Sequence, residues 1–332
     1  MLTAPLLKLE SQPFQKDRLR EWNLLWTIRG KFRNGERLMF KVGVDNFCYH
    51  RFFGSTIPGE SAPGKRWTLD DFLNRAAELK LDTVSLETCF MPPLNPPFLE
   101  SLRRKLDDRN LEGMLSWGHP RGLETGKNQA AAEELKKAIE AAHFLGTKVL
   151  RIVGGGLTDR TQEPVRPQIE RLIPVLTDLA GFATSRDVVL AMENHMDFMA
   201  DEQVEILQRV GSPHLGVTLD TVNNIRLLED PIAVVRKLAP YAVATHIKDV
   251  IATGKGSPVT EWRRFWPSAP LGKGIIDLPL VIDILTQNRY AGPLNLEIDL
   301  LDPRWPDEDA AVAESITYLR NLVFALSAQK PK

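Results

Sequence analysis

Short apolar runs alternate with amphipathic segments along this chain from about residue 39 onward, and this alternation limits its possible folds more than any other feature. The apolar runs are typical of strands buried on both faces, and the segments between them carry apolar residues at helical spacing. Strands are predicted at residues 42–47, 83–87, 111–117, 148–153, 188–193, 215–220, 243–246 and 293–297. Alternating strands and helices favour a parallel sheet, and eight such units favour a closed (β/α)8 TIM barrel of the α/β class.

A predicted helix follows each predicted strand. The helices are expected at residues 69–80, 97–108, 128–145, 168–185, 201–209, 232–238, 279–287 and 310–328. Gly146 ends the third of these helices as a cap. A doubly wound sheet is the competing architecture, but it would not bring the ends of the last four strands around one point.

Each of the last four predicted strands ends on a side chain that can bind a metal: Glu193, Asp220, His246 and Glu297. Strand ends of a (β/α)8 barrel meet on one face, so we expect these side chains to converge. Taken singly, Asp220 is equally well explained as a helix cap, and His246 is better explained as a satisfied core residue. Glu193 and Glu297 close apolar strands, where a buried charge needs a partner. Together the four predict a site for one divalent ion, with Mn²⁺ as first choice and Mg²⁺ or Co²⁺ as alternatives.

The composition is that of a globular protein, with 43% hydrophobic and 26% charged residues. A formal net charge of −1 gives no reason to expect a nucleic-acid partner, and no apolar run approaches the length of a membrane span. The two cysteines, Cys48 and Cys89, do not make a disulfide framework, so we expect reduced thiols and a cytoplasmic location.

Residues 1–38 lack the core pattern that begins near Met39. We expect them to be an N-terminal extension, either disordered or created by an upstream start site, and residues 39–332 to form the catalytic barrel domain. A deletion of residues 1–38 is then expected to leave folding and activity intact.

A long loop is predicted after the seventh strand, at residues 251–276, and it contains Trp262, Phe265 and Trp266. Loops of this kind on a functional face are often lids or binding loops, but its aromatic residues are equally consistent with partner docking or with packing. Three glycines at 154–156 follow the fourth strand. They lack the context of a phosphate-binding motif, which favours a flexible loop.

Four segments of the second half carry a family resemblance. Met-Glu-Asn-His at 192–195, Leu-Asp-Thr at 219–221, His-Ile-Lys-Asp at 246–249 and Leu-Glu-Ile-Asp at 296–299 resemble the sugar phosphate isomerase/epimerase superfamily, with its xylose-isomerase-like barrel. The resemblance implies that Glu193, Asp220, His246 and Glu297 bind the metal. It also implies proton removal next to a carbonyl. Endonuclease IV shares this fold, but its additional histidine ligands are missing here.

Ketose 3-epimerases of this superfamily use the first and last Glu as a pair of bases, a role that Glu193 and Glu297 can fill. The chain departs from their pattern at three positions, where Met199, Asn223 and Ala252 stand in place of a Glu, a His and an Arg. Isomerisation or epimerisation of a free ketose is therefore kept as the alternative reaction.

The first half is similar to the α subunit of C-glycoside deglycosidases at residues 45–54, 85–90 and 117–120. This resemblance implies β-elimination from 3-oxo-glycosides, with His195 as the base and Glu193 or Glu297 assisting. It also implies a small β subunit as partner. The alternative reading of His195 is a histidine that orients a ligand or caps a helix.

Other polar residues at strand ends suit the binding of sugar hydroxyls. These candidate contacts are Glu87, His119, Arg151, Lys248 and Asp249, with Tyr49 and His50 near the barrel mouth. A different class of function also stays open, in which the barrel mainly binds a partner protein.

Overall fold

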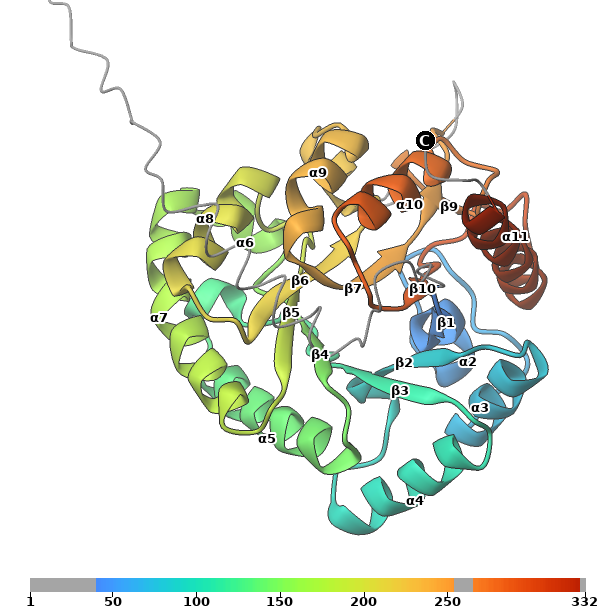
Figure 1. Ribbon diagram of the computed structural model, residues 1–332, viewed down its shortest axis with the longest axis horizontal. Helices are drawn as coiled ribbons and strands as arrows, with labels where there is room; N and C mark the ends of the chain where they lie inside the picture. The colour runs from blue at the N-terminus through green and yellow to red at the C-terminus, as the bar shows by residue number, and fades with distance from the viewer. Residues whose placement is uncertain (1–39, 254–264, 329–332) are drawn as a thin grey trace, which may run out of the picture.

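The computed structural model describes residues 40–253 and 265–328, in which eight parallel strands close into a barrel (Figure 1). The strands are β1 (Val42–Asp45), β2 (Thr83–Glu87), β3 (Glu112–Ser116), β4 (Val149–Ile152), β5 (Val189–Glu193), β6 (Leu215–Asp220), β7 (Ala242–Ile247) and β10 (Leu294–Leu296). They follow chain order around the barrel, and β1 pairs with both β2 and β10. The predicted (β/α)8 barrel is confirmed, and the doubly wound sheet is excluded.

Helices surround the strands on the outside of the barrel (Figure 1). The longer ones are α3 (Leu69–Glu78), α4 (Pro96–Asp107), α5 (Gln129–Leu145), α7 (Val165–Thr184), α8 (Ala200–Val210), α9 (Pro231–Leu238), α10 (Leu278–Gln287) and α11 (Glu308–Ala328). Local sequence sets their ends: Thr68 and Asp71 form a capping box before α3, and Gly146 ends α5 in the left-handed conformation at φ 77°. None of the described helices has the length and apolar character needed to cross a membrane.

Two short helical segments follow β1 and direct the chain away from the strand axis. These are the 3-10 helix η1 (Asn46–Tyr49) and α2 (His50–Phe53). Asp45 caps η1, because its Oδ1 accepts the backbone N–H of Phe47 at 2.7 Å. A further 3-10 helix, η4 (Asn223–Leu227), follows β6, and α6 (Leu157–Gln162) follows the glycines after β4.

The segment predicted as one long loop after β7 contributes one strand to a small antiparallel ribbon at its base. Its strands are β8 (Asp249–Val250) and β9 (Ser268–Ala269). Phe265 is exposed and Trp266 is partly buried against the core, whereas Trp262 lies outside the described residues. The expectation for residues 1–38 also concerns a part of the chain outside those residues.

Small and polar side chains fill much of the barrel beneath its carboxyl end. Thr83 Oγ1 donates to Asn295 Oδ1 at 2.9 Å, next to Gly43. A Cβ at Gly43 would lie 2.0 Å from the threonine oxygen and 2.2 Å from the asparagine oxygen, so only glycine fits there. Ser85 and Ser116 lie two residues further along their strands than Thr83 and Met114, and their hydroxyls are 2.8 Å apart. This polar interior leads up to the ends of the strands.

Candidate metal centre

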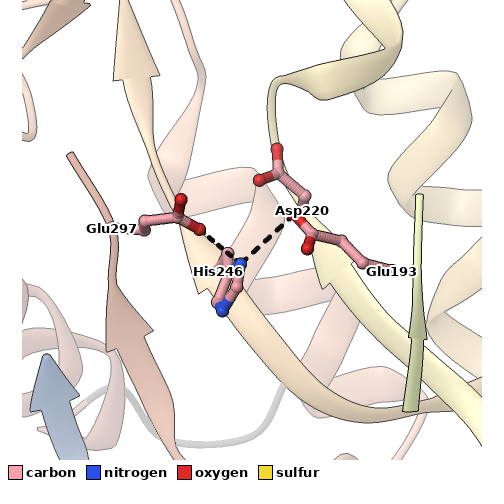
Figure 2. A group of neighbouring side chains, drawn as sticks. All are labelled: Glu193, Asp220, His246 and Glu297. Atoms are coloured by element: carbon pink, nitrogen blue, oxygen red, sulfur yellow. Dashed lines mark hydrogen bonds and ion pairs between the residues drawn. The ribbon is translucent and has the colours of Figure 1, made fainter. Parts of the chain in front are cut away.

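Four side chains from neighbouring strands meet at the carboxyl end of the barrel (Figure 2). Glu193 ends β5, Asp220 ends β6, His246 lies near the end of β7, and Glu297 directly follows β10. Each residue offers one ligand atom, these atoms lie within 4.8 Å of one another, and all four residues are buried. The structure therefore brings together the four residues that the sequence predicted as metal ligands.

Glu193 is held by donors on both of its oxygens. Arg151 binds Oε2 through Nε at 2.5 Å and through a second guanidinium nitrogen. Asn223 Nδ2 donates to Oε1 at 2.9 Å, and His246 Nδ1 lies 3.3 Å from the same oxygen. Burial alone would raise the pKa of Glu193, but Arg151 and His246 outweigh it and hold this pKa well below its ordinary value. Glu193 is therefore a fixed anion.

Lys248 lies between Asp220 and Glu297. Its Nζ is 3.0 Å from Asp220 Oδ2 and 3.1 Å from Glu297 Oε1, with Asp299 Oδ2 at 3.8 Å. Burial disfavours the ammonium, but Asp220 and Glu297 raise the pKa of Lys248 well above its ordinary value. Burial of Glu297 is likewise outweighed, by His246 and Lys248, which lower the pKa of Glu297 to about 2. The lysine therefore neutralises part of the charge of the ligand group.

His246 directs Nδ1 toward the glutamates of this group, as Figure 2 shows. Nδ1 forms an ion pair with Glu297 Oε2, while Nε2 lies 3.6 Å from Asp45 Oδ2. Burial lowers the pKa of His246, but Glu297 and Glu193 reverse this effect and raise it well above the ordinary value. The imidazole is thus held between carboxylates on its two sides.

The donor set fits a divalent cation. Three carboxylates and one imidazole are ligands that ions such as Mn²⁺ accept. Among the described residues, Asp220 Oδ2 and Glu297 Oε2 are buried oxygens without a hydrogen bond, although both lie within ion-pair distance of a cationic side chain. Burial also raises the pKa of Asp220 to about 6, against the opposing charge of Lys248. A divalent ion would compensate these buried acids.

His195 lies two residues beyond Glu193 and is half-buried. Its Nδ1 is 3.4 Å from the carbonyl oxygen of Gly155, which can only accept, so Nδ1 carries the hydrogen and Nε2 has the lone pair. Burial lowers the pKa of His195 to about 4, so its imidazole is neutral near pH 7. Such an imidazole is able to accept a proton.

Glu87 and Arg151, two of the expected sugar contacts, lie directly beside the ligand group. Arg151 Nη1 is 3.4 Å from Glu87 Oε1, and the same guanidinium binds Glu193. Burial raises the pKa of Glu87 to about 8, so this carboxyl is able to hold a proton at neutral pH.

Two further expected contacts have partners outside the ligand group. Asp249 accepts the backbone N–H groups of Gly272, Gly274 and Ile276 at 3.0, 2.8 and 3.1 Å. His119 is half-buried and stacks on Trp117, with ring centroids 5.0 Å apart. Through its three bonds, Asp249 fixes the position of residues 272–276, at the end of the loop after β7.

Tyr49 and His50, expected near the barrel mouth, are fully buried in the wall instead. The Tyr49 hydroxyl donates to Asp309 Oδ1 at 2.8 Å, and His50 Nε2 lies 2.8 Å from Glu60 Oε2. The physical reason is that η1 and α2 turn the chain after β1. They direct Tyr49 toward Asp309 and His50 toward Glu60. They are not brought to the four ligand residues.

Sequence reasoning did not single out Asp45 and Asn223, whose side chains contact ligand side chains. Asn223 stood out only as a departure from the epimerase pattern, yet its amide binds Glu193. Asp45 ends β1, just as the ligand residues lie at the ends of their own strands. This shared position could have indicated that Asp45 lies near the ligand group.

The comparisons with known proteins agree with this architecture. A family model described as a xylose isomerase-like TIM barrel matches residues 73–322. A curated relative, 3-oxo-isoapionate decarboxylase from Pectobacterium atrosepticum, is 25% identical over 187 residues. That match spans 55% of this chain and 60% of the relative.

Solved structures share the fold at lower identity. The structure of L-ribulose 3-epimerase matches with a TM-score of 0.66 and 20% identity, covering 89% of this chain and 100% of that one. The structure of the IOLI protein, which has a bound zinc atom, matches with a TM-score of 0.65 and 17% identity, covering 86% and 98%. At these identities the likeness bears on the fold alone.

Proposed function

The chain belongs to the xylose isomerase-like TIM barrel family, and from this membership and the buried ligand group we propose that it is a metal-dependent enzyme acting on keto-sugars. The reaction begins with removal of a proton from the carbon next to the carbonyl. The leading candidate is β-elimination from a 3-oxo-glycoside, with Mn²⁺ as the metal and His195 as the base.

One observation supports this choice over the other two candidate bases, Glu193 and Glu297. Both glutamates form ion pairs with buried cationic side chains, whereas His195 forms none within the described residues. Arg151 and Asn223 occupy both oxygens of Glu193. Glu297 is a poor base, because its pKa is lowered to about 2 against the opposing effect of burial.

The chain's own residues then divide the work. A divalent ion held by Glu193, Asp220, His246 and Glu297 would act as a Lewis acid on the carbonyl oxygen. His195 accepts the proton at Nε2, since Gly155 fixes the hydrogen on Nδ1. Glu87 and Arg151 lie beside the ligand group and are suited to bind sugar hydroxyls.

The C–H bond next to the ketone breaks, its proton goes to His195, and its electron pair forms the enolate. That pair then forms a carbon–carbon double bond as the bond from the neighbouring carbon to the aglycone breaks. The aglycone leaves with the bonding electrons and takes up the proton that His195 gives back, directly or through water.

The curated relative supports this electron flow. Its name describes loss of carbon dioxide from a 3-oxo acid, which likewise leaves an electron pair next to a carbonyl. The relative's substrate is not carried over, because the match spans only 60% of that protein.

Isomerisation or epimerisation of a free ketose is the second candidate. It is supported by the meeting of Glu193 and Glu297 in one group, because two carboxylates on different strands are suited to act on opposite faces of a carbon. A barrel subunit with a mainly partner-binding role, including a small β subunit as partner, is the candidate of another class.

The test is incubation of the purified protein and Mn²⁺ with 3-oxo-glucosides and with free ketoses in buffered D₂O. Release of the aglycone supports the elimination. Deuterium in an unbroken sugar supports the isomerase or epimerase. Binding without turnover supports the partner subunit, and absence of divalent-ion binding by the wild-type protein sinks the metal-dependent proposal.

A further inference from the structure

Asp45 lies beside the ligand group, where it faces Nε2 of His246 while the glutamates face Nδ1. Its Oδ2 is 3.6 Å from His246 Nε2, and both residues are fully buried. Asp45 ends β1, which reaches β7 only through β10 in the order of the barrel. The contact therefore crosses the barrel interior.

The Asp45 carboxylate is fixed by its own donors. Oδ1 accepts the backbone N–H of Phe47 at 2.7 Å. Oδ2 accepts the hydroxyl of Ser85 at 2.5 Å and that of Ser116 at 3.3 Å. Asp45 and Ser85 are also paired in the register of β1 and β2, so the carboxylate has little freedom to turn away from His246.

His246 has one nitrogen on each side of this arrangement. Nδ1 faces Glu193 and Glu297, whereas Nε2 has no hydrogen bond within the described residues and faces Asp45. A neutral imidazole carries one hydrogen, and a carboxylate beside Nε2 favours its location there. The lone pair of Nδ1 is then directed toward the ligand group.

We propose that Asp45 is a positioning residue, which holds the His246 ring and its Nε2 hydrogen so that Nδ1 binds the metal. The inference rests on the metal site of the proposed function. Carboxylates in this relation to a metal-binding histidine typically change metal affinity by roughly 10- to 100-fold when they are replaced.

The experiment compares Mn²⁺ affinity, measured by isothermal titration, in the full-length wild type, Asp45→Asn and Thr83→Val. Thr83→Val is the matched control, because it removes a buried hydroxyl that bonds Asn295 in the same interior. We expect Asp45→Asn to weaken Mn²⁺ binding roughly 10- to 100-fold and Thr83→Val to leave it within about twofold. In parallel, nitrogen-15 NMR of the Zn²⁺-loaded protein reports which nitrogen of His246 carries the hydrogen.

Each result has a definite meaning. Hydrogen on Nε2 of the wild type, together with weaker Mn²⁺ binding by folded Asp45→Asn, supports the inference. Unchanged affinity in this variant, an equal loss in Thr83→Val, or metal on Nε2 of the wild type overturns it. The wild-type NMR result decides the question even if Asp45→Asn does not fold. A wild-type protein that binds neither Mn²⁺ nor Zn²⁺ overturns the proposed metal site itself.

Discussion

Arg151 binds Glu193 with two guanidinium nitrogens inside the barrel, while its third nitrogen lies 3.4 Å from Glu87. One buried cation thus supports a ligand of the metal centre and a neighbouring carboxyl. Loss of one partner from such a buried group is costly, because the remaining charge stays uncompensated.

Replacement of this arginine is therefore expected to affect the metal-free protein most. Arg151→Met should lower the free energy of unfolding by roughly 3–5 kcal/mol without metal, and Mn²⁺ should restore part of the loss by binding the folded state. Thermal unfolding with and without Mn²⁺ measures both effects. Arg186→Met is the control, because Arg186 makes a similar double contact with Glu140 at the surface. An equal loss of stability in the two variants contradicts the prediction.

Substitution of the ligands should abolish stoichiometric metal binding. Glu297→Gln and His246→Ala each remove one donor of the four-residue group, so we expect both to lose Mn²⁺ binding and turnover. Metal content after gel filtration and isothermal titration provide the measurements. Glu170 forms an ion pair with Arg209 on the outer surface, so the control variant Glu170→Gln should bind Mn²⁺ as the wild type does. Retention of full Mn²⁺ affinity by both ligand variants would count against this centre.

His195→Ala should separate metal binding from chemistry. In the described part of the chain the histidine contacts the carbonyl of Gly155 and forms no ion pair with the four ligand residues, so Mn²⁺ affinity is expected to stay within about twofold. Turnover should fall by roughly 10²- to 10⁴-fold, the usual contribution of a positioned base. His143→Ala, on the exposed surface of α5, is the matched control for kcat. Near-normal turnover in His195→Ala would exclude the histidine as the base.

Asp197 should make stability depend on pH. It is fully buried, and burial raises its pKa to about 7, well above the roughly 3.9 of an unfolded Asp. Below pH 4 the Asp197 carboxyl is protonated in both the folded and the unfolded protein. Between pH 4 and 7 the unfolded protein has released this proton and the folded protein still holds it, so stability falls as the pH rises. Above pH 7 the carboxyl is ionised in both states, and the loss of unfolding free energy relative to pH 4 stays constant at about 4 kcal/mol or less.

The Asn variant tests this sign. Asp197→Asn cannot ionise, so its unfolding temperature relative to the wild type should increase between pH 4.5 and pH 8. Thermal unfolding in a series of buffers gives the difference at each pH. A difference that stays constant across the series contradicts the predicted effect.

The side chains at the strand ends could be predicted because a strand has a fixed geometry. Side chains alternate between the two faces, and parallel strands in a barrel end on one side. These rules alone bring Glu193, Asp220, His246 and Glu297 together, and the structure agrees.

Residues beyond the strand ends could not be placed in this way. Tyr49 and His50 follow β1 closely, but the helical turns after Asp45 direct them into the wall. Asn223 reaches Glu193 from the first position of η4, beyond the end of β6. The direction of a side chain in a loop depends on the path of the whole loop, which local sequence does not specify.

Asp249 separates the long loop after β7 from the ligand strand. By accepting three backbone N–H groups from residues 272–276, it closes the base of the loop one residue after Lys248, and Ile251 N binds Pro267 O to complete this closure. Changes of length or composition between residues 253 and 265 therefore need not move His246. In evolutionary terms, the sequence of this segment is free to change while the framework that holds the four ligand residues is inherited unchanged.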